Sequence, residues 1–331
     1  KLRRAIPDYD ILFESLDPEA FAAASIGQVH RGVLRDGREV AVKIQYPNAD
    51  RMVRADLKNL KALLGSLMAL FTDIEFEPIW GEVRARLVEE LDYEHEAENI
   101  RRMGEMQADC PGIIVPVVIP EATSKGVLTM EFVEGIPPAE AISDAYPQAL
   151  KDQWGRALFE FTLRGLFEHR FLHADPNFAN FAFREDGTVA VYDYGCMKEI
   201  PEDIAVGYAG LMDAVIRRRK TAIPGILQDM GVFKVDGQQL SREMTDPHVD
   251  LLQDIVRASP PYTFGEDSSF YEAMYELGMA SWQEATDIRF PQDVVFINRT
   301  LVGLFGNLGK LRATGPWRKL LRTYTSAGGS A

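Results

Sequence analysis

Three polar residues in the middle of the chain have side chains that suit a metal-bound phosphate. Asp175 and Asn180 lie close together, and Asp193 follows at the start of the segment Asp-Tyr-Gly. Between them, residues 181–192 form two short β-prone runs joined by a Glu-Asp-Gly turn signal, which predicts a β-hairpin. Such a hairpin brings the three side chains to one end. Carboxylate and amide oxygens there suit hard divalent cations and their phosphates.

The order and spacing of these residues are those of a kinase catalytic loop and its metal-binding segment. In such proteins an Asp is followed after four residues by an Asn, and an Asp-aromatic-Gly segment comes next along the chain. Each piece alone is also found in solvated turns. The combination, with strands in between, favours phosphoryl transfer. That chemistry further requires a lysine, a glutamate and a nucleotide hinge.

The lysine is Lys43, which lies in a β-alternating run over 39–45. A turn at 35–37 joins this run to an earlier one, and a loop of small residues precedes both: Ala22, Ala23, Ala24 and Ser25. A small-residue loop, a hairpin and a strand with one lysine are how kinase-type folds cover and hold phosphates. The alternative is a surface lysine on an edge strand, which the Val-Ala-Val-Lys context disfavours.

An acidic cluster follows on a predicted helix from about 78 to 106: Glu90, Asp92, Glu94, Glu96 and Glu98. So many acids usually indicate a solvated helix face. A lysine held out of water nevertheless needs a carboxylate partner, because an unpaired buried charge is very costly. Glu96 and Asp92 lie one turn apart on one face of this helix, so both are candidates.

The segment 130–135, Met-Glu-Phe-Val-Glu-Gly, ends a predicted strand over 126–133 and is similar to an adenine-binding hinge. The main chain of Glu131 and Val133 would pair with the edge of the base, and Met130 would lie at the back of the pocket. The alternative is an ordinary strand end with a glycine stop.

The remaining elements are read from periodicity and from proline and glycine signals. Before the hinge we predict helices over 8–18 and 49–71 and a strand over 113–119. A long helix over 146–170 leads into the catalytic-loop segment. After Gly195 the chain reads as helical throughout, with helices predicted over 201–219, 223–230, 247–258, 267–282, 291–308 and 316–324.

Composition and charge narrow the class of protein. The 331 residues are 46% hydrophobic and 26% charged, as in an enzyme with two domains or lobes. A net charge of −14 argues against a nucleic-acid binder. The cysteines, Cys110 and Cys196, are expected to be free thiols in a reducing compartment. No apolar run approaches the roughly 18 residues of a membrane span. The start, which lacks a Met and an apolar signal region, suggests a fragment or a processed form.

Charge is unevenly distributed along the chain. No acidic residue follows Asp293, whereas six basic residues do: Arg299, Lys310, Arg312, Arg318, Lys319 and Arg322. These side chains are either simply solvated or form a docking face for an anionic membrane surface or another partner.

Taken together, these motifs resemble the UbiB family of atypical protein-kinase-like proteins, which is linked to ubiquinone and isoprenoid-lipid metabolism. The matching segments lie between about residues 20 and 195: 22–30, 40–47, 90–99, 130–135, 173–180 and 191–195. The later Phe-Ile-Asn-Arg-Thr-Leu segment is also similar, though less specifically.

The resemblance implies an α+β, two-lobed kinase-like fold. A small β-rich N-lobe with extra helices would span 1–135, and a helical C-lobe 136–331. The ligands implied are ATP or ADP with Mg²⁺ or Mn²⁺. Lys43 would contact the α/β-phosphates and pair with Glu96, while Asp175 would stand at the catalytic-base position. The resemblance also assigns the metal to Asn180 and Asp193, and places Glu90 and Asp92 near the phosphates.

The sequence also departs from ordinary kinases. Ala22 to Ser25 replace a glycine-rich loop, and alanines stiffen a loop and add methyl groups near the phosphates. Ala174 replaces the usual arginine of the catalytic loop, and no Ala-Pro-Glu follows Asp193. The family's Lys-x-Gly-Gln motif is absent and would lie upstream of Lys1.

We therefore expect an ATPase, or a kinase acting on a lipid, quinone precursor or other small molecule, in the cytoplasm or on a membrane surface. A nucleotide-regulated scaffold is the alternative from another class. An orthodox Ser/Thr protein kinase fits less well, because no peptide-docking segment is recognisable.

Overall fold

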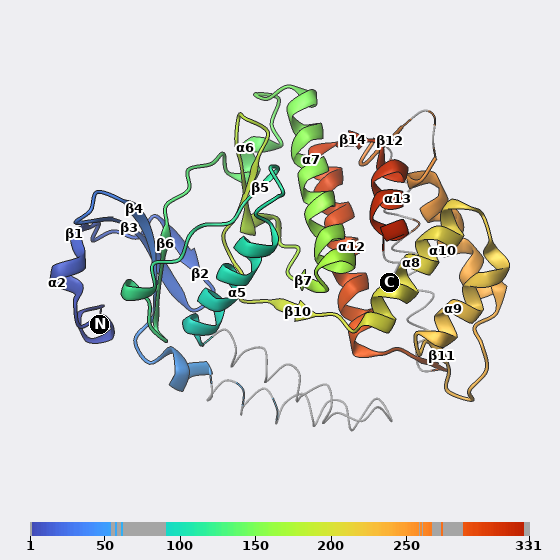
Figure 1. The fold of residues 1–331 in the computed structure, drawn as a ribbon, viewed down its shortest axis with the longest axis horizontal. Helices are drawn as coiled ribbons and strands as arrows, with labels where there is room; N and C mark the ends of the chain where they lie inside the picture. The colour runs from blue at the N-terminus through green and yellow to red at the C-terminus, as the bar shows by residue number, and fades with distance from the viewer. Residues whose placement is uncertain are drawn as a thin grey trace. The chain divides into compact units, whose positions relative to one another are not determined.

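The computed structural model describes residues 2–53, 57, 61, 91–257, 259, 261–266, 273 and 287–327 (Figure 1). The chain forms two compact units. The first comprises residues 1–108, 115–134 and 191–196, and the second comprises residues 109–114, 135–190 and 197–331. The first unit contains an antiparallel sheet and the second is mainly helical, which confirms the predicted α+β class. The predicted N-lobe overlaps the first unit, and the predicted C-lobe overlaps the second.

The sheet of the first unit has five strands within the described residues. They are β1 (Phe13–Leu16), β2 (Ala22–Ala24), β3 (Gly27–Leu34), β4 (Glu39–Gln45) and β6 (Val127–Glu131). The order is β1-β3-β4-β6, β2 also pairs with β3, and all pairings are antiparallel. Figure 1 shows β3, β4 and β6 side by side. Gly37, with φ of 89°, makes the tight turn between β3 and β4 that the sequence predicts.

One face of this sheet is covered by the N-terminal segment. Short helices α1 (Leu2–Ala5) and α2 (Tyr9–Leu12) pack against a buried cluster that includes Ile6, Phe13 and Val40. The helix predicted over 8–18 is therefore wrong in its second half. The chain becomes strand β1 at Phe13, because pairing with β3 buries Phe13 opposite Leu34.

Helix α5 (Tyr93–Met106) packs against β6 in the first unit. Asp92 precedes it with extended backbone (φ −118°, ψ 92°), so the predicted continuous helix over 78–106 is wrong at this point. Residues 62–90 lie outside the described residues, and with them most of the helix predicted over 49–71. Its described positions, 49–53, 57 and 61, are helical.

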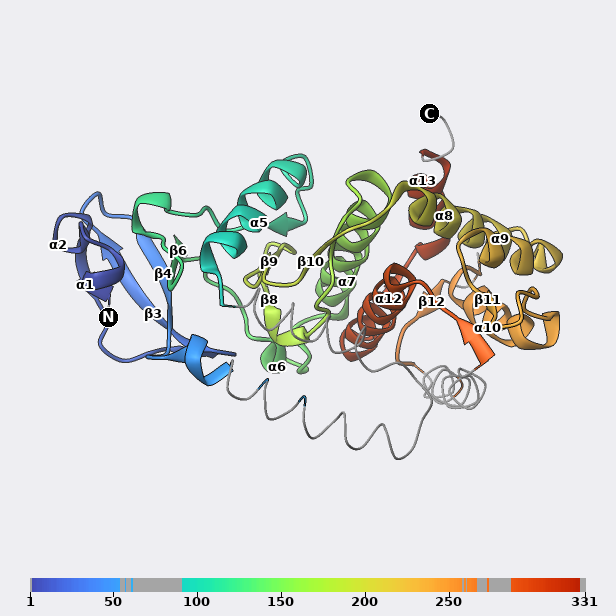
Figure 2. The ribbon, with the colours of Figure 1, turned by 90° about the horizontal axis from the view of Figure 1, so that it is seen from below.

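The second unit is built around two long helices, α7 (Gln148–Leu163) and α12 (Gln292–Leu311), which lie side by side in Figures 1 and 2. A π-helical turn (Arg164–Glu168) extends α7 as the sequence predicts. Among its described residues, this unit also contains α6 (Pro138–Ala141), α8 (Glu202–Ile216), α9 (Ile223–Asp229), α10 (Arg242–Ile255) and α13 (Trp317–Ala327). The buried rings of Trp317, Phe159 and Phe264 join α13 to this core.

Helix α10 begins five residues earlier than predicted. The sequence predicts a start at Pro247, whereas the described helix begins at Arg242 and contains this proline. The turn before Pro247 is held by the Ser241 carbonyl, which accepts from the Thr245 amide and hydroxyl. The described residues also include short 3₁₀ turns at Pro120–Ala122, Phe178–Asn180 and Lys220–Ala222.

Short strand pairs support the loops of the second unit. The predicted hairpin is present as β8 (Phe181–Phe183) and β9 (Val189–Val191), and β5 (Ile113–Ile114) pairs with β9. Only these two residues of the strand predicted over 113–119 are in β5. The prediction of helices alone after Gly195 is also wrong. The described part contains β10 (Met197–Glu199), β11 (Phe233–Lys234), β12 (Tyr262–Thr263), β13 (Ile288–Arg289) and β14 (Thr314–Gly315).

The reason for the short strands is long-range pairing, which local periodicity does not reveal. Strand β10 pairs with β7 (Phe171–His173), which leads into the Asp175 loop. Strand β11 pairs with β13, and β12 pairs with β14.

Candidate functional site

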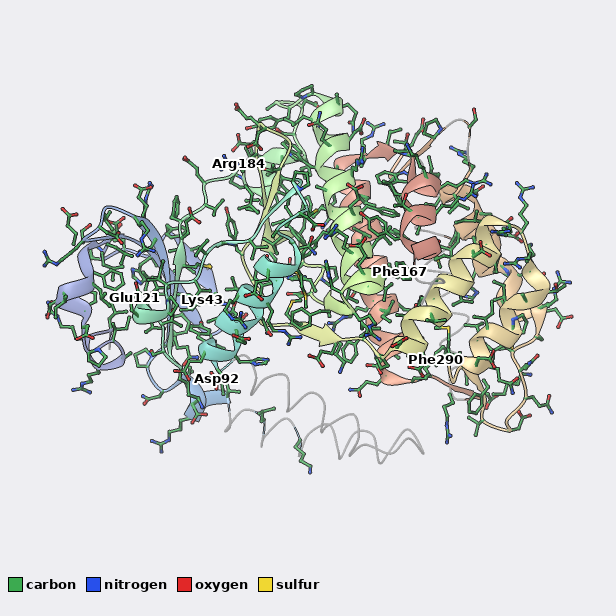
Figure 3. All side chains as sticks on the ribbon, in the orientation of Figure 1. Lys43, Asp92, Glu121, Phe167, Arg184 and Phe290 are labelled. Atoms are coloured by element: carbon green, nitrogen blue, oxygen red, sulfur yellow. The ribbon has the colours of Figure 1, made fainter. Side chains whose placement is uncertain are left out.

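Lys43 is buried in the first unit and contacts two carboxylates. Its Nζ donates to both carboxylate oxygens of Glu96 at 2.9 Å and to Oδ2 of Asp193 at 3.2 Å. The side chains of Lys43 and Glu96 are 10% and 5% exposed, whereas that of Asp193 is 33% exposed. Figure 3 labels Lys43, which lies in strand β4. Lys43 is thus not a surface lysine, and the structure brings three of the predicted site residues together.

The electrostatics of this group keep the lysine protonated. Burial by itself lowers the pKa of Lys43, but the carboxylates of Glu96 and Asp193 outweigh burial, so the pKa lies above its usual value. Burial raises the pKa of Glu96, and the lysine charge opposes that rise. The protonated side chain of Lys43 is therefore held beside Asp193, whose carboxylate is partly exposed.

Helix α5 also holds the main chain of the Asp-Tyr-Gly segment. The Tyr194 N–H donates to Glu96 Oε1 at 3.3 Å, and the Asn99 side-chain amide donates to the Tyr194 carbonyl at 3.0 Å. The Gly195 N–H donates to Asp193 Oδ1 at 3.0 Å, which fixes that carboxylate. Sequence reasoning missed Asn99. The available signal was its position three residues after Glu96, on the same helix face.

Asp92 caps helix α5 and does not pair with Lys43. Its Oδ1 accepts from the amides of Glu94 and His95 at 3.1 and 3.3 Å, the usual contacts of an N-cap aspartate. Its Oδ2 lies 3.6 Å from Lys125 Nζ, and Figure 3 labels Asp92 at the start of the helix. Asp92 therefore orients the helix that carries Glu96. Glu90, the other residue predicted near the phosphates, lies outside the described residues.

Gln45 links the start of helix α5 to strand β4, which also carries Lys43. The buried amide of Gln45 donates to the carbonyl of Leu91 at 2.8 Å and to that of Lys125 at 3.3 Å. Sequence reasoning missed this residue too. It lies two positions after Lys43 in β4, and period-two alternation places both side chains on the same face of the sheet.

The alanine-rich segment is a strand over most of its length. Ala22, Ala23 and Ala24 form β2 and pair with Val29, Gln28 and Gly27 of β3, in that order. The loop predicted at 22–25 is therefore wrong for the three alanines, because a tight hairpin returns the chain at 25–26.

Gly27 has a packing reason to lack a side chain. A Cβ atom at this position would overlap the Ile44 carbonyl, so glycine is what allows β3 to approach β4 closely.

The predicted hinge lies at the end of β6 in the first unit. Met130 is buried, as expected for a residue at the back of a pocket. The Glu131 N–H donates to the Val117 carbonyl at 2.8 Å, and the Tyr192 hydroxyl donates to the Val133 carbonyl at 2.7 Å. These two hydrogen bonds use the Glu131 N–H and the Val133 carbonyl, and they involve neither the Glu131 carbonyl nor the Val133 N–H.

In the second unit, Asp175 and Asn180 are in direct contact. The Asn180 amide nitrogen donates to Asp175 Oδ2 at 2.8 Å, and the Asn177 N–H donates to Oδ1 at 3.3 Å. Asp175 is half-buried, so its carboxylate is both oriented and accessible. Because the Asn180 nitrogen faces Asp175, the amide oxygen is the atom that Asn180 can offer to a metal ion.

Helix α12 holds the main chain on both sides of Asp175. The Arg299 guanidinium donates to the Ala174 carbonyl at 2.7 Å, and the Asn307 amide donates to the Pro176 carbonyl at 2.8 Å. A Cβ at Gly303 would overlap the Pro176 ring, so glycine permits the close approach. We call Arg299, Gly303 and Asn307 the α12 clamp. Sequence reasoning missed all three, although their four-residue spacing places them on one helix face.

The side chains of Asp193 and of Asn180 each carry an oxygen that suits Mg²⁺ or Mn²⁺. A carboxylate and an amide oxygen are hard ligands, and such sites use one or two protein carboxylates together with water and substrate phosphates. Asp193 lies in the first unit and Asn180 in the second, and each is at least partly accessible.

Among the described helices, none has the length and apolar character needed to cross a membrane.

Comparison with known proteins identifies relatives of this chain. Mitochondrial atypical kinase COQ8B of Rattus norvegicus is 34% identical over 262 residues, which are 78% of this chain and 49% of the relative. Mitochondrial atypical kinase coq-8 of Caenorhabditis elegans is 30% identical over 316 residues, which are 93% of this chain and 41% of the relative. The chain thus spans less than half the length of these curated relatives.

The fold likewise has a solved counterpart. The structure of a complex of Rv3197 with erythromycin from Mycobacterium tuberculosis superposes with a TM-score of 0.81 at 25% identity, covering 98% of this chain and 82% of that one. Residues 7–226 match the ABC1 atypical kinase-like domain. As its resemblance to UbiB proteins predicted, the chain therefore belongs to the ABC1 atypical kinase-like family.

Proposed function

We propose that this chain binds MgATP and MgADP and uses ATP either in hydrolysis or in phosphoryl transfer to a small-molecule or lipid acceptor. An isoprenoid quinone precursor is the acceptor class that the UbiB resemblance implies. The observation that carries the proposal is the buried Lys43 with its two carboxylates, Glu96 and Asp193. Phosphoryl transfer depends mainly on positioning and electrostatics, and this group supplies both.

The first unit would bind the nucleotide. The ammonium of Lys43, held by Glu96, would contact the α/β-phosphates, and the main chain at Glu131 and Val133 would hold the base. Mg²⁺ would neutralise the phosphate charge, and Asp193 is the residue of this unit that would bind it. Asp193 is the more exposed of the two carboxylates on Lys43, which suits a group that must also reach a metal ion.

The second unit would serve the transferred group. Asp175 is oriented by Asn180 and by the Asn177 N–H, and it would accept a proton from the attacking hydroxyl or water. The α12 clamp would keep the Asp175 main chain in place. A regular Ser/Thr kinase remains the weaker assignment, because the segment after Asp193 continues into β10 without an Ala-Pro-Glu motif.

A nucleotide-regulated scaffold is the second candidate. The observation that favours it is the contact between Lys43 and Asp193, which engages the carboxylate that the metal ion needs. A scaffold of this kind would bind nucleotide with no turnover.

Two measurements test these candidates. A thermal-shift titration with ADP and ATP should raise the melting temperature in a concentration-dependent manner with Mg²⁺ and lose the rise in EDTA, since ligands of the folded state stabilise it. The absence of any shift at millimolar nucleotide would refute both candidates.

Steady ATP turnover that Asp193→Asn abolishes would support the enzyme. The matched control is Glu185→Gln, an exposed carboxylate that should leave turnover unchanged. Nucleotide binding with no turnover would leave the scaffold.

A further inference from the structure

A groove in the second unit is lined by basic side chains. It has a volume of about 470 Å³, and Arg257, Arg318, Lys319 and Arg322 line it above Gly315 and Pro316. Among the described residues that form the groove, no side chain is acidic. This concentration of positive charge is unusual in a chain whose net charge is −14.

The fold brings these cations together from two distant segments. Strand β12 pairs with β14, opposing Tyr262 and Gly315, and the Trp317 indole donates to the Tyr262 carbonyl at 2.8 Å. These contacts place the chain that follows α10 beside the start of α13. Arg257, just after α10, lies over the Tyr262 ring at 5.5 Å.

The amphipathic pattern of α13 supplies the remaining cations. Trp317, Leu320 and Leu321 are buried against the core of the second unit. Arg318, Lys319 and Arg322 alternate with them at helical spacing and line the groove. The positive charge is therefore imposed by the packing of α13 and does not depend on one mobile side chain.

We propose that this groove binds a small soluble anion that carries two or more phosphate groups. Like charges repel more strongly as they converge, and a multivalent anion relieves that repulsion. Guanidinium groups match phosphate oxygens in a bidentate geometry. A volume of this size is typical of small-molecule sites, which occupy roughly 300–1,000 Å³.

The surroundings favour a soluble anion over a membrane surface. Amphipathic helices that insert into the surface of a bilayer present large apolar side chains beside their basic ones. None of the residues that line the groove is a large aliphatic or aromatic one. The exposed large apolar residues of the second unit, such as Phe290, Val295 and Val302, lie outside the lining. The membrane surface expected from the sequence stays a separate prediction, and sedimentation with anionic vesicles tests it.

The groove is distinct from the proposed nucleotide site, with which it shares no residue. Its test therefore does not depend on turnover. Isothermal titration calorimetry of the full chain with inorganic pyrophosphate in EDTA measures binding at the groove. EDTA removes the divalent metal that a nucleotide site requires. We expect saturable binding by the wild-type chain that weakens as salt is raised, because charge–charge attraction is screened.

Matched variants locate the binding. The double variant Arg318→Gln/Lys319→Gln should raise the dissociation constant at least tenfold. Arg312→Gln removes a charge from the same basic stretch, exposed but outside the groove, and should change it less than twofold. Lys43→Met should likewise leave pyrophosphate binding unchanged. Melting temperatures measured for each variant exclude unfolding as the cause of a loss.

Several outcomes would overturn the proposal. The wild-type chain could fail to bind millimolar pyrophosphate. Alternatively, the Arg312→Gln control could lose as much affinity as the double variant, and that result would indicate binding to diffuse surface charge. Loss of binding in Lys43→Met would assign the pyrophosphate to the nucleotide site. Sedimentation with vesicles of phosphatidic acid and phosphatidylcholine, in the absence of pyrophosphate binding, would assign the basic residues to a membrane surface.

Discussion

The guanidinium of Arg299 donates a hydrogen bond to the carbonyl of Ala174 at 2.7 Å, across 125 positions of sequence. Ala174 precedes the proposed catalytic Asp175 and stands where ordinary kinases have an arginine. It is fully buried, so a large side chain has no room there. The cation that supports this loop therefore comes from helix α12 and contacts the main chain. The loop is thus held by a helix that is distant in sequence, and not by a side chain of the loop itself.

Arg299→Ala should lower ATP turnover at least tenfold and leave the dissociation constant of MgADP within about twofold, because displacement of a catalytic group by about 1 Å can cost about 100-fold in rate. The free energy of unfolding should fall by about 1.5–3 kcal/mol, as for other hydrogen bonds to charged groups. Steady-state kinetics and nucleotide titration measure the two effects.

Arg299→Lys separates positioning from general stability. Lysine retains the charge and one donor, so it should recover part of the turnover. If Arg299→Lys regains stability but no turnover, or if nucleotide affinity falls together with turnover in the Ala variant, the positioning role is wrong.

Gly303→Ala tests the other contact of the α12 clamp. The new Cβ would overlap the Pro176 ring, so the loop or the helix must move, at a cost of about 1–3 kcal/mol for overpacking. Turnover should fall with it. Gly306→Ala is the matched control, since a Cβ there meets no atom within 4 Å. It should be neutral or stabilise the protein by up to about 1 kcal/mol, because alanine favours helix. Equal melting temperatures in the two variants would contradict the clamp geometry.

Much of the fold could be predicted from the sequence where local signals and fold agree. The hairpin of β8 and β9, the strand with Lys43 and the turn at Gly37 all have clear alternation and turn residues. The helices predicted around α7 and α12 have strong apolar periodicity. In contrast, β10 to β14 consist of two or three residues each, and they exist because a distant strand pairs with them. Local propensity contains little information about such pairs.

The candidate site shows the same limit. Lys43, Asp175, Asn180 and Asp193 stand in motifs whose spacing is informative by itself. Asn99 and the α12 clamp contact main-chain carbonyls, which any sequence provides, so no partner residue type reveals them. For Asp92 the sequence predicts a position on a helix face, because its acidic neighbours continue the pattern. Only the backbone shows that it caps the helix.

Lys43→Met should weaken MgADP binding and lower the free energy of unfolding by about 3–5 kcal/mol, because it leaves Glu96 buried without its cation. Adding Glu96→Leu should restore part of the stability and none of the nucleotide affinity. Denaturant unfolding of both variants, with nucleotide titrations, measures these effects. A cost below about 0.5 kcal/mol for Lys43→Met, as is usual at a surface, would contradict the buried pair.

The pH dependence of that cost follows from the direction of the lysine shift. The pKa of Lys43 is raised in the folded state. Its stabilising contribution is therefore fully present below the ordinary lysine value of about 10.4 and is lost only as the pH rises through the higher folded value. Because Lys43→Met removes the cation that opposes the rise in the Glu96 pKa, the variant loses further stability as Glu96 ionises, so the stability difference between wild type and Lys43→Met should stay level or grow from pH 6 to 9. A difference that shrinks within this range would mean that the lysine deprotonates there.

Ala23→Gly tests whether the alanine-rich hairpin controls nucleotide preference. Ala23 is exposed and pairs with Gln28, so its methyl group is not part of the core. Glycine at this position widens the accessible backbone conformations and removes a methyl group from the hairpin that would cover the phosphates. We expect a changed ratio of the ATP and ADP dissociation constants, with a loss of about 0.5–1 kcal/mol in stability from glycine in a strand. Val33→Ala, farther along β3, is a stability control that should leave the ratio unchanged. An unaltered ratio and unaltered turnover in Ala23→Gly, beside a lower melting temperature, would mean that the alanines serve only the strand.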